Sequence, residues 1–276
     1  MDALINSKSD SRVEHLSEII IQEGGPDLLS VPAVALLVQQ HVPVPQVSVV
    51  IPTLNEAENL RWLLPRLPDW LAEVIIVDGC STDATVAVAR ELKPEAKIVL
   101  ETRRGKGAAL RAGFEAATGD VIVMMDADGS MHPDEIIRFV AALMTGADFA
   151  KGSRFMQGAG TSDMTLFRRT GNLGLTLAVR SLYGSSFSDL CYGYLAFWRC
   201  HVPLLHSDCD GFEIETLINI RALKGKLKIV EVASYESDRI HGTSNLRAIP
   251  DGWRVLKTIV RERVGRGTPL PVVEAA

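Results

Sequence analysis

The feature that most constrains the fold is a regular alternation, from Val47 onward, of short apolar runs with amphipathic stretches. The apolar runs are rich in Val and Ile and are bounded by turn or charged residues, as buried strands are. Strands are therefore predicted at residues 47–51, 73–77, 97–100 and 120–125, with helices at 56–67, 82–92, 107–117 and 133–144. Such alternation is typical of βαβ units, so we expect an α/β fold whose mostly parallel sheet is flanked by helices.

Beyond Ala150 the pattern is less regular. It predicts helices at 165–183, 212–223 and 252–264 and strands at 192–198 and 227–232. We expect one domain over residues 46–266. An extension at 1–45 that carries no motif would precede it, and a tail at 267–276 would follow it.

The charge balance and the cysteines exclude several classes of protein. With 29 Lys and Arg against 34 Asp and Glu, the formal net charge is −5, whereas proteins that coat nucleic acids are basic. The four cysteines form no CxxC pair and no zinc-like spacing with His, which is typical of free thiols in a reducing compartment. No apolar run approaches the roughly 18 residues that cross a bilayer, and the N-terminus lacks a signal-peptide pattern. We therefore expect a cytoplasmic protein that does not bind nucleic acid.

Polar side chains follow each of the first four predicted strands. The segments are 52–56, 78–83, 101–107 and 126–130, and they hold carboxylates, amides and cations. Because right-handed crossovers bring the carboxyl ends of parallel strands to one edge, these side chains are expected to converge there. The convergence of four segments indicates a ligand site more strongly than any one motif does.

Two Asp-x-Asp pairs occur, at Asp126/Asp128 and at Asp208/Asp210, and their contexts differ. Asp126 directly follows an apolar run, where an unpaired carboxylate would be costly unless it met a cation. Oxygen ligands favour Mg²⁺ or Mn²⁺, which keep open positions for substrate phosphates. We therefore predict a divalent metal site at Asp126 and Asp128, whereas Asp208 and Asp210 are expected to be solvated or to cap a helix.

Asp78 and Lys106 each allow two interpretations. Asp78 would form a turn with Gly79 or would bind the base or ribose of a nucleotide, and its position at a strand end favours the second. Lys106 lies between two glycines at the start of a helix, where it would meet an anion or remain solvated. The GxxxxGK[ST] and GxGxxG spacings do not occur at these strand ends, which argues against a P-loop NTPase and a dinucleotide-binding dehydrogenase.

The ordered set of these motifs resembles family-2 inverting glycosyltransferases of the GT-A fold. The motifs are Pro52-Thr53-Leu54-Asn55-Glu56, residues 77–83, Gly105-Lys106-Gly107, Asp126-Ala127-Asp128 and Gly152-Ser153-Arg154. Two later segments, 188–194 and 239–246, are similar to the polyprenyl-phosphate branch of that family, typified by dolichol-phosphate mannose synthase. The resemblance covers residues 47–264 and implies a Rossmann-like nucleotide-binding half followed by an acceptor half.

The resemblance also implies roles for particular residues. The nucleotide sugar would be held by Pro52, Thr53, Leu54, Glu56, Asp78, Lys106, Asp126, Ala127 and Asp128. The metal on its diphosphate would be bound by Asp126, Asp128 and Ser130, the last at a position where the family often has a Gln. The catalytic residues would be Asp128, Arg154, Arg239 and Asp189, with the two arginines facing the phosphates of donor or acceptor. The family's Ser-Lys pair is Ser244-Asn245 here, so a phosphate-binding Lys is missing.

We therefore expect metal-dependent inverting transfer of a hexose from a UDP- or GDP-sugar to a polyprenyl phosphate, with peripheral contact at the inner face of the membrane. The basic helix at 252–264 fits such contact, and it fits equally well a core helix with a solvated basic side. One alternative keeps the donor chemistry but uses a soluble hydroxyl acceptor, which needs a general base among Asp189, Glu213 and Glu215. A nucleotidyltransferase would need a Gly-rich loop at residues 52–56, where the sequence has none.

Overall fold

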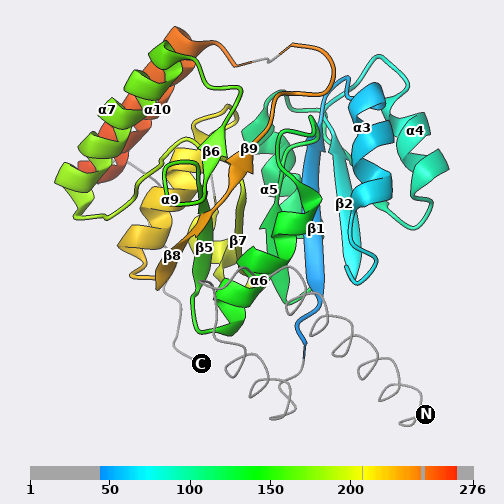
Figure 1. The fold of residues 1–276 in the computed structure, drawn as a ribbon, viewed down its shortest axis with the longest axis horizontal. Coiled ribbons are helices and arrows are strands. Elements are labelled where there is room, and N and C mark those ends of the chain that lie inside the picture. The colour runs from blue at the N-terminus through cyan, green and yellow to red at the C-terminus, as the bar shows by residue number, and fades with distance from the viewer. Residues whose placement is uncertain (1–43, 207, 244–245, 266–276) are drawn as a thin grey trace. The chain divides into compact units, whose positions relative to one another are not determined.

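The computed structural model describes residues 44–206, 208–243 and 246–265. The predicted tail at 267–276 and residues 1–43 of the predicted extension lie outside these ranges, so the domain boundaries stay a prediction. Within the described part, a seven-stranded sheet lies between two layers of helices (Figure 1).

The sheet is parallel except at one strand. Its strands are β1 (Val47–Thr53), β2 (Glu73–Asp78), β3 (Lys97–Leu100), β4 (Val121–Met124), β5 (Phe149–Ser153), β7 (Leu195–Trp198) and β8 (Ile229–Ala233). They lie in the order β3-β2-β1-β4-β7-β5-β8, and β7 runs antiparallel to both β4 and β5. The prediction of a mostly parallel sheet flanked by helices is confirmed.

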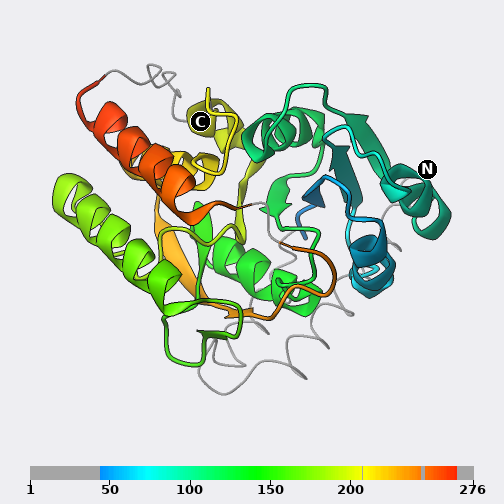
Figure 2. The ribbon, with the colours of Figure 1, turned by 90° about the horizontal axis from the view of Figure 1, so that it is seen from above.

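Helices cover both faces of the sheet. They are α3 (Ala57–Leu63), α4 (Thr85–Leu92), α5 (Lys106–Ala116), α6 (Ile136–Met144), α7 (Leu166–Tyr183), α8 (Val202–Leu205), α9 (Ile214–Lys224) and α10 (Ala248–Arg263). Short 3-10 turns lie at Leu64–Arg66, Pro133–Glu135 and Arg199–His201. On one face, Leu110 and Phe114 of α5 and Ile218 of α9 share an apolar core with the central strands. The helices α3 and α6 lie on the opposite face (Figure 2), which leaves the carboxyl ends of the strands as the open edge.

Several elements differ from their predictions. The pattern predicts no strand at Phe149–Ser153, because Lys151, Gly152 and Ser153 interrupt the apolar run, yet every residue of β5 is buried between β7 and β8. Two short strands, β6 (Gly160–Thr161) and β9 (Tyr235–Glu236), also pair without an apolar pattern. The helix predicted to start at 252 begins at Ala248, because proline fits a first helical turn and the Asp251 carboxylate accepts the Arg247 N–H.

The two long helices, α7 and α10, lie side by side (Figures 1 and 2), and both contact α9. An apolar cluster joins the three helices through Val179, Ile220, Val255 and Ile259. Neither these helices nor any other in the described ranges combines the length and the apolar character that crossing a membrane requires.

Candidate functional site

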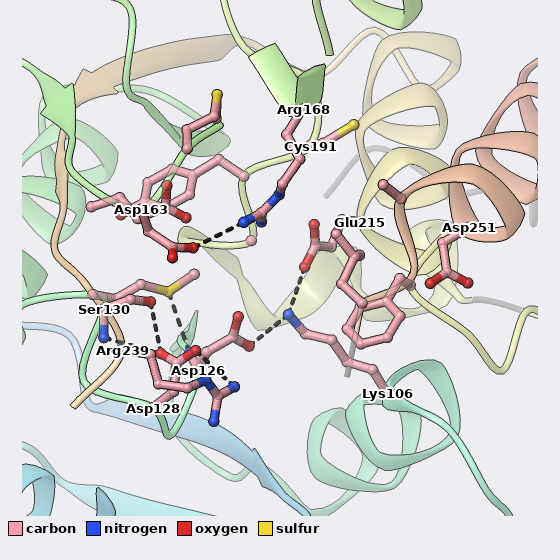
Figure 3. Close-up of a pocket in the computed structure, with 18 of the residues that line it drawn as sticks. Lys106, Asp126, Asp128, Ser130, Asp163, Arg168, Cys191, Glu215, Arg239 and Asp251 are labelled. Carbon is pink, nitrogen blue, oxygen red and sulfur yellow. Dashed lines mark hydrogen bonds and ion pairs between the residues drawn. The ribbon is translucent and has the colours of Figure 1, made fainter. Parts of the chain in front are cut away.

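A cavity of about 830 Å³ lies at the carboxyl ends of β1 and β4 and extends to α7 and α10. Most of the predicted site residues line it, as Figure 3 shows for Lys106, Asp126, Asp128, Ser130 and Arg239. These lining residues are Pro52, Thr53, Leu54, Glu56, Lys106, Asp126, Ala127, Asp128, Ser130, Arg154 and Arg239. The convergence expected from the strand order therefore occurs, and two predicted residues, Asp78 and Asp189, lie outside the lining.

Lys106 bridges two carboxylates inside the cavity (Figure 3). Its Nζ lies 2.5 Å from Asp126 Oδ1 and 2.6 Å from Glu215 Oε1, which brings α5, the turn after β4, and α9 together. Burial lowers the pKa of Lys106, but the charges of Asp126 and Glu215 outweigh burial and raise that pKa overall. Burial raises the pKa of Glu215, and the charge of Lys106 opposes this rise. The ammonium group therefore stays charged and fixes the position of Asp126.

Arg239 makes a second bridge, from the segment that precedes α10. Its Nη2 lies 3.0 Å from Asp128 Oδ2, and its Nη1 donates to Glu56 Oε1 at 3.0 Å. The backbone N–H and the hydroxyl of Ser130 both donate to Asp128 Oδ1, at 3.0 and 2.7 Å. Burial raises the pKa of Glu56, against the hydrogen bonds that it accepts from Asn59 and Arg239. The Asp128 carboxylate is thus oriented from two sides.

The two aspartates fit a hard divalent cation that takes its remaining ligands from a substrate. Both follow β4 in one turn, and Asp126 keeps 28% of its side chain exposed. In the ranges that the structure describes, no three His, Cys, Asp or Glu side chains lie close enough to hold a metal by themselves. Mg²⁺ usually binds through one or two carboxylates together with substrate phosphates and waters. The donor set is therefore compatible with a cation that arrives with a diphosphate. Ser130 orients Asp128, and its role as a metal ligand stays a prediction.

Arg154 lines the cavity, and two carboxylates hold its guanidinium group: Glu236, which also lines the cavity, and Asp189, which does not. Its Nε and Nη2 donate to Asp189 at 2.7 and 3.0 Å, and its Nη1 donates to Glu236 at 3.0 Å. The guanidinium carbon also lies 4.7 Å from the ring centre of Tyr192. Each guanidinium nitrogen therefore already has a carboxylate partner in the described conformation, and contact between Arg154 and a phosphate stays a prediction.

Asp189 is fully buried, and its carboxylate accepts from Arg154 and from Asn172 Nδ2, the latter at 3.0 Å. Burial raises the pKa of Asp189, but the hydrogen bonds and the charge of Arg154 outweigh burial and lower that pKa overall. A buried carboxylate with a lowered pKa is a poor general base. The catalytic role of Asp189 stays a prediction, and in the described conformation its carboxylate holds Arg154.

Asp78 is buried at the end of β2. It forms a turn, which is the first of the two roles predicted for it from the sequence. Its Oδ2 accepts the Ser81 N–H at 3.0 Å, as an Asx-type turn does. The neighbouring Gly79 lines the cavity. A contact between Asp78 and a nucleotide stays a prediction, and in the described conformation this side chain organises the loop that borders the cavity.

The first turn of α7, to which no sequence motif assigns a role, supplies Arg168 to the cavity wall (Figure 3). Arg168 Nη1 lies 2.9 Å from Asp163 Oδ2, and 28% of the arginine side chain is exposed. In the sequence, the feature that could have indicated this residue is the pair Arg168-Arg169, which lies in a helix without acidic residues. Glu215, considered from the sequence only as a general base, instead anchors Lys106.

Gly193 is expected to accept no side chain, because a Cβ there would lie 2.5 Å from Glu215 Oε1 and 3.1 Å from Lys106 Nζ. Gly193→Ala should push the Lys106–Glu215 pair apart and weaken the binding of a nucleoside diphosphate with Mn²⁺ by about tenfold, measured by calorimetry. The matched control is Gly174→Ala on α7, where a Cβ meets open space. Equal affinities of the two variants would contradict the expectation.

Comparisons with known proteins agree with this geometry. Residues 48–200 match the model of glycosyl transferase family 2. A dolichol-phosphate mannosyltransferase of Pyrococcus furiosus is 35% identical over 73% of this chain and 59% of its own length. A polyprenol monophosphomannose synthase of Mycolicibacterium smegmatis is 32% identical over 74% of this chain and 82% of its own. The chain thus spans less than two thirds of the Pyrococcus relative and most of the mycobacterial one.

Among solved structures, glucosyl-3-phosphoglycerate synthase of Mycobacterium tuberculosis, in complex with Mn²⁺, UDP and glucosyl-3-phosphoglycerate, has the same fold. The TM-score is 0.64 at 22% identity, and the match covers 92% of this chain and 84% of that one. The likeness shows the GT-A-type fold that the motifs predict.

Proposed function

Because the chain belongs to glycosyl transferase family 2, we propose that it moves a hexose from a UDP- or GDP-sugar to a polyprenyl phosphate with the help of Mg²⁺ or Mn²⁺. Relatives named for dolichol phosphate and for polyprenol support the lipid acceptor. The transfer would take place at the cytoplasmic face of a membrane. The observation that carries the proposal is the charge of the strand-end cluster.

That cluster holds more negative than positive charge. Lys106 and Arg239 contact the carboxylates of Asp126, Asp128, Glu56 and Glu215, so two cations meet four carboxylates and leave a formal charge of −2. A diphosphate would be repelled there unless a divalent cation came with it. Such a cation supplies charge that stabilises the leaving diphosphate. The chain's own contribution is to hold Asp126 and Asp128 in place through Lys106, Arg239 and Ser130.

The acceptor side favours a group that is already ionised. A phosphate oxygen carries negative charge at neutral pH and attacks without a general base, whereas a hydroxyl needs one. Of the three carboxylates considered as bases, Asp189 is held by Arg154 and Glu215 is held by Lys106. The third, Glu213, lies outside the cavity lining. Arg168, with a single carboxylate partner and partial exposure, is the cavity cation best able to donate to an acceptor phosphate.

Arg168→Ala should therefore raise the KM for the lipid phosphate about tenfold to a hundredfold and leave the affinity for the donor unchanged. The reason is the loss of a charge-assisted hydrogen bond, worth ~1.5–3 kcal/mol. The adjacent Arg169, which stacks 5.5 Å from the ring of Phe155, offers the matched control Arg169→Ala. If the two variants behave alike in steady-state kinetics, Arg168 does not contact the acceptor.

The proposed function is tested by offering the purified full-length chain UDP- and GDP-sugars with Mn²⁺ and either a polyprenyl phosphate or soluble sugars. We expect label to enter the organic-soluble lipid fraction with release of a nucleoside diphosphate. If label enters only soluble hydroxyl compounds, the acceptor is a hydroxyl and not a lipid phosphate. The candidate base is then Glu215, whose pKa burial raises. Release of pyrophosphate instead of a nucleoside diphosphate would show that the chain catalyses nucleotidyl transfer and not glycosyl transfer.

A further inference from the structure

Lys106 divides its contacts between an aspartate of the proposed metal pair and a glutamate outside that pair. Its Nζ lies 2.5 Å from Asp126 Oδ1 and 2.6 Å from Glu215 Oε1, and Figure 3 shows the ammonium group between the two carboxylates. The Glu215 side chain is 10% exposed, whereas the Asp126 side chain is 28% exposed. Asp126 is therefore the more accessible of the two partners to a cation that enters from the cavity.

Arg239 divides its contacts in the same way. Its Nη2 lies 3.0 Å from Asp128 Oδ2, and its Nη1 lies 3.0 Å from Glu56 Oε1. Asp128 belongs to the proposed metal pair, and Glu56, which precedes α3, does not. Each aspartate of the pair thus contacts one cation of the chain, and each of these cations has a second carboxylate. Two separate elements, α5 and the segment before α10, repeat the same arrangement.

The backbone that carries Lys106 is held at the start of α5. The Gly107 N–H donates to Asp210 O at 2.8 Å. A Cβ on Gly105 would lie 2.0 Å from Asp210 O, and a Cβ on Gly107 would lie 2.2 Å from Cys209 O. Because the first turn of the helix packs directly on another stretch of backbone, Lys106 changes partners by rotating its side chain and not by moving its helix.

The backbone around Arg239 is tied to its surroundings on two sides. The Ile240 N–H donates to Asp128 O at 3.0 Å, in the turn that holds the two aspartates. Asn59 of α3 forms two hydrogen bonds with the backbone of His241, at 2.8 and 3.1 Å. The guanidinium group therefore stays within reach of both of its carboxylates when it changes partners.

The second carboxylate makes the release of an aspartate possible. A buried cation that loses its only carboxylate is strongly destabilised. When Lys106 releases Asp126, however, it stays paired with Glu215, and Arg239 has the same support from Glu56. The two glutamates therefore let another cation reach the aspartates without leaving an unpaired charge in the cavity wall.

The charges favour an exchange that involves a metal and a diphosphate together. Two cations and four carboxylates leave the cluster at −2, and a divalent cation brings it to zero. A divalent cation alone competes with an ion pair at each aspartate and gives the displaced cations no new partner. A diphosphate supplies anionic oxygens that the ammonium and guanidinium groups can contact. Lys106 and Arg239 therefore oppose a metal that arrives alone more than one that arrives with a diphosphate.

We propose that Lys106 and Arg239 compete with a divalent cation for Asp126 and Asp128, so that the chain binds the metal weakly alone and tightly only together with a nucleoside diphosphate. Glu215 and Glu56 are the positioning residues that keep the displaced cations paired. The competition rests on the metal site of the proposed function and adds an order of binding to it.

The test is a titration of the full-length chain with Mn²⁺ alone, followed by the electron paramagnetic resonance signal of the free ion. Lys106→Met should raise the affinity for Mn²⁺ alone about tenfold to a hundredfold, the order by which a nearby opposite charge changes the cation affinity of a carboxylate. The same variant should lower the affinity for UDP or GDP at saturating Mn²⁺, because the diphosphate loses a cation. Arg239→Met should act in the same two directions. Damage to the fold would weaken both ligands.

The matched control is Arg168→Met, which removes a cation that lines the same cavity and pairs with Asp163. It changes the charge of the cavity by the same amount as Lys106→Met does, so its affinity for Mn²⁺ alone should rise much less. Equal increases in the two variants would show that overall charge limits metal binding, and the competition would be overturned.

Glu215→Gln tests the positioning role. With Glu215 neutral, Lys106 pairs more strongly with Asp126, so the affinity for Mn²⁺ alone should fall about tenfold. In Lys106→Met/Glu215→Gln the competing ammonium is absent, and the same Glu→Gln change should have little effect. This double variant leaves Glu215 with no unpaired buried charge, so it measures the competition even if Lys106→Met is unstable. Additive effects of the two substitutions would overturn the positioning role.

These titrations need neither a sugar donor nor an acceptor, so they are separate from transfer. If Mn²⁺ and UDP or GDP bind together but Lys106→Met leaves the affinity for Mn²⁺ alone unchanged, the competition is rejected and the proposed function stands. If the competition is found but no sugar is transferred, the competition stands and the proposed function is rejected. If neither the wild-type chain nor the double variant binds Mn²⁺ with or without nucleotide, the metal site and the competition are both rejected.

Discussion

Asp128→Ala is expected to abolish the binding of a nucleoside diphosphate that depends on Mn²⁺ and to lower turnover by about a hundredfold to a thousandfold. Asp128 joins Ser130 and Arg239, so alanine removes the carboxylate that we propose binds the metal and leaves Arg239 with Glu56. Calorimetric titration of UDP and GDP with and without Mn²⁺ measures the first effect. Chelation with EDTA should reproduce it in the wild-type chain.

The control for this variant is Asp134→Ala, a short distance along the same segment. Asp134 is exposed, its Oδ2 lies 3.2 Å from His132 Nδ1, and it lies outside the cavity lining. Its loss should change neither donor affinity nor the thermal midpoint. Undiminished donor affinity of Asp128→Ala in the presence of Mn²⁺ would remove the metal from the proposed mechanism.

Arg154→Met is expected to cost about 3–5 kcal/mol in the free energy of unfolding at neutral pH. The substitution leaves Asp189, which is fully buried, and Glu236, which is nearly so, without their shared cation. Urea denaturation measures the loss. Arg61→Met is the matched control, because Arg61 pairs with Glu58 and Glu91 at the surface, where an ion pair contributes about 1 kcal/mol or less.

The loss should shrink as the pH falls. In the wild-type chain the lowered pKa of Asp189 contributes stability above the ordinary pKa of a carboxyl group, and this stability is lost on acidification. Without Arg154, burial alone raises the pKa of Asp189, so protonation stabilises the variant relative to its deprotonated form. The two unfolding free energies should therefore converge toward about pH 4. A difference that stays constant with pH would show that lost packing, not the unpaired carboxylate, causes the instability.

The donor side of the site could be predicted from the sequence because its residues follow apolar strands. Asp126 and Asp128 come directly after β4, and Glu56 follows β1, so the rule that parallel strands share one edge is enough to bring them together. The rule does not say which cation meets which carboxylate. The bridge from Lys106 to Glu215 joins residues 109 positions apart, and no local pattern records it.

The acceptor side could not be predicted in the same way. Charged residues such as Arg154 and Asp189 are predicted from the sequence to contact ligands. In the fold, the two side chains form a buried ion pair with each other. The strand β5 is not predicted from the sequence because its buried Lys151 interrupts the apolar run. The exposed apolar residues of α7 and α10, such as Leu166 and Trp253, could not be predicted as exposed, since amphipathic spacing shows that two sides of a helix differ and does not show which side is covered.

The antiparallel strand β7 has a consequence for how the chain is made. The strands β4 and β5 leave the ribosome well before β7, which must enter between them, and α7 lies in the interval. Until Leu195–Trp198 emerges, one edge of β4 and both edges of β5 stay unpaired in the nascent chain, so the segment up to β5 is not a module that closes by itself. Fragments that stop before this strand should therefore aggregate, and engineered fusions or split versions of the protein should place their break after it.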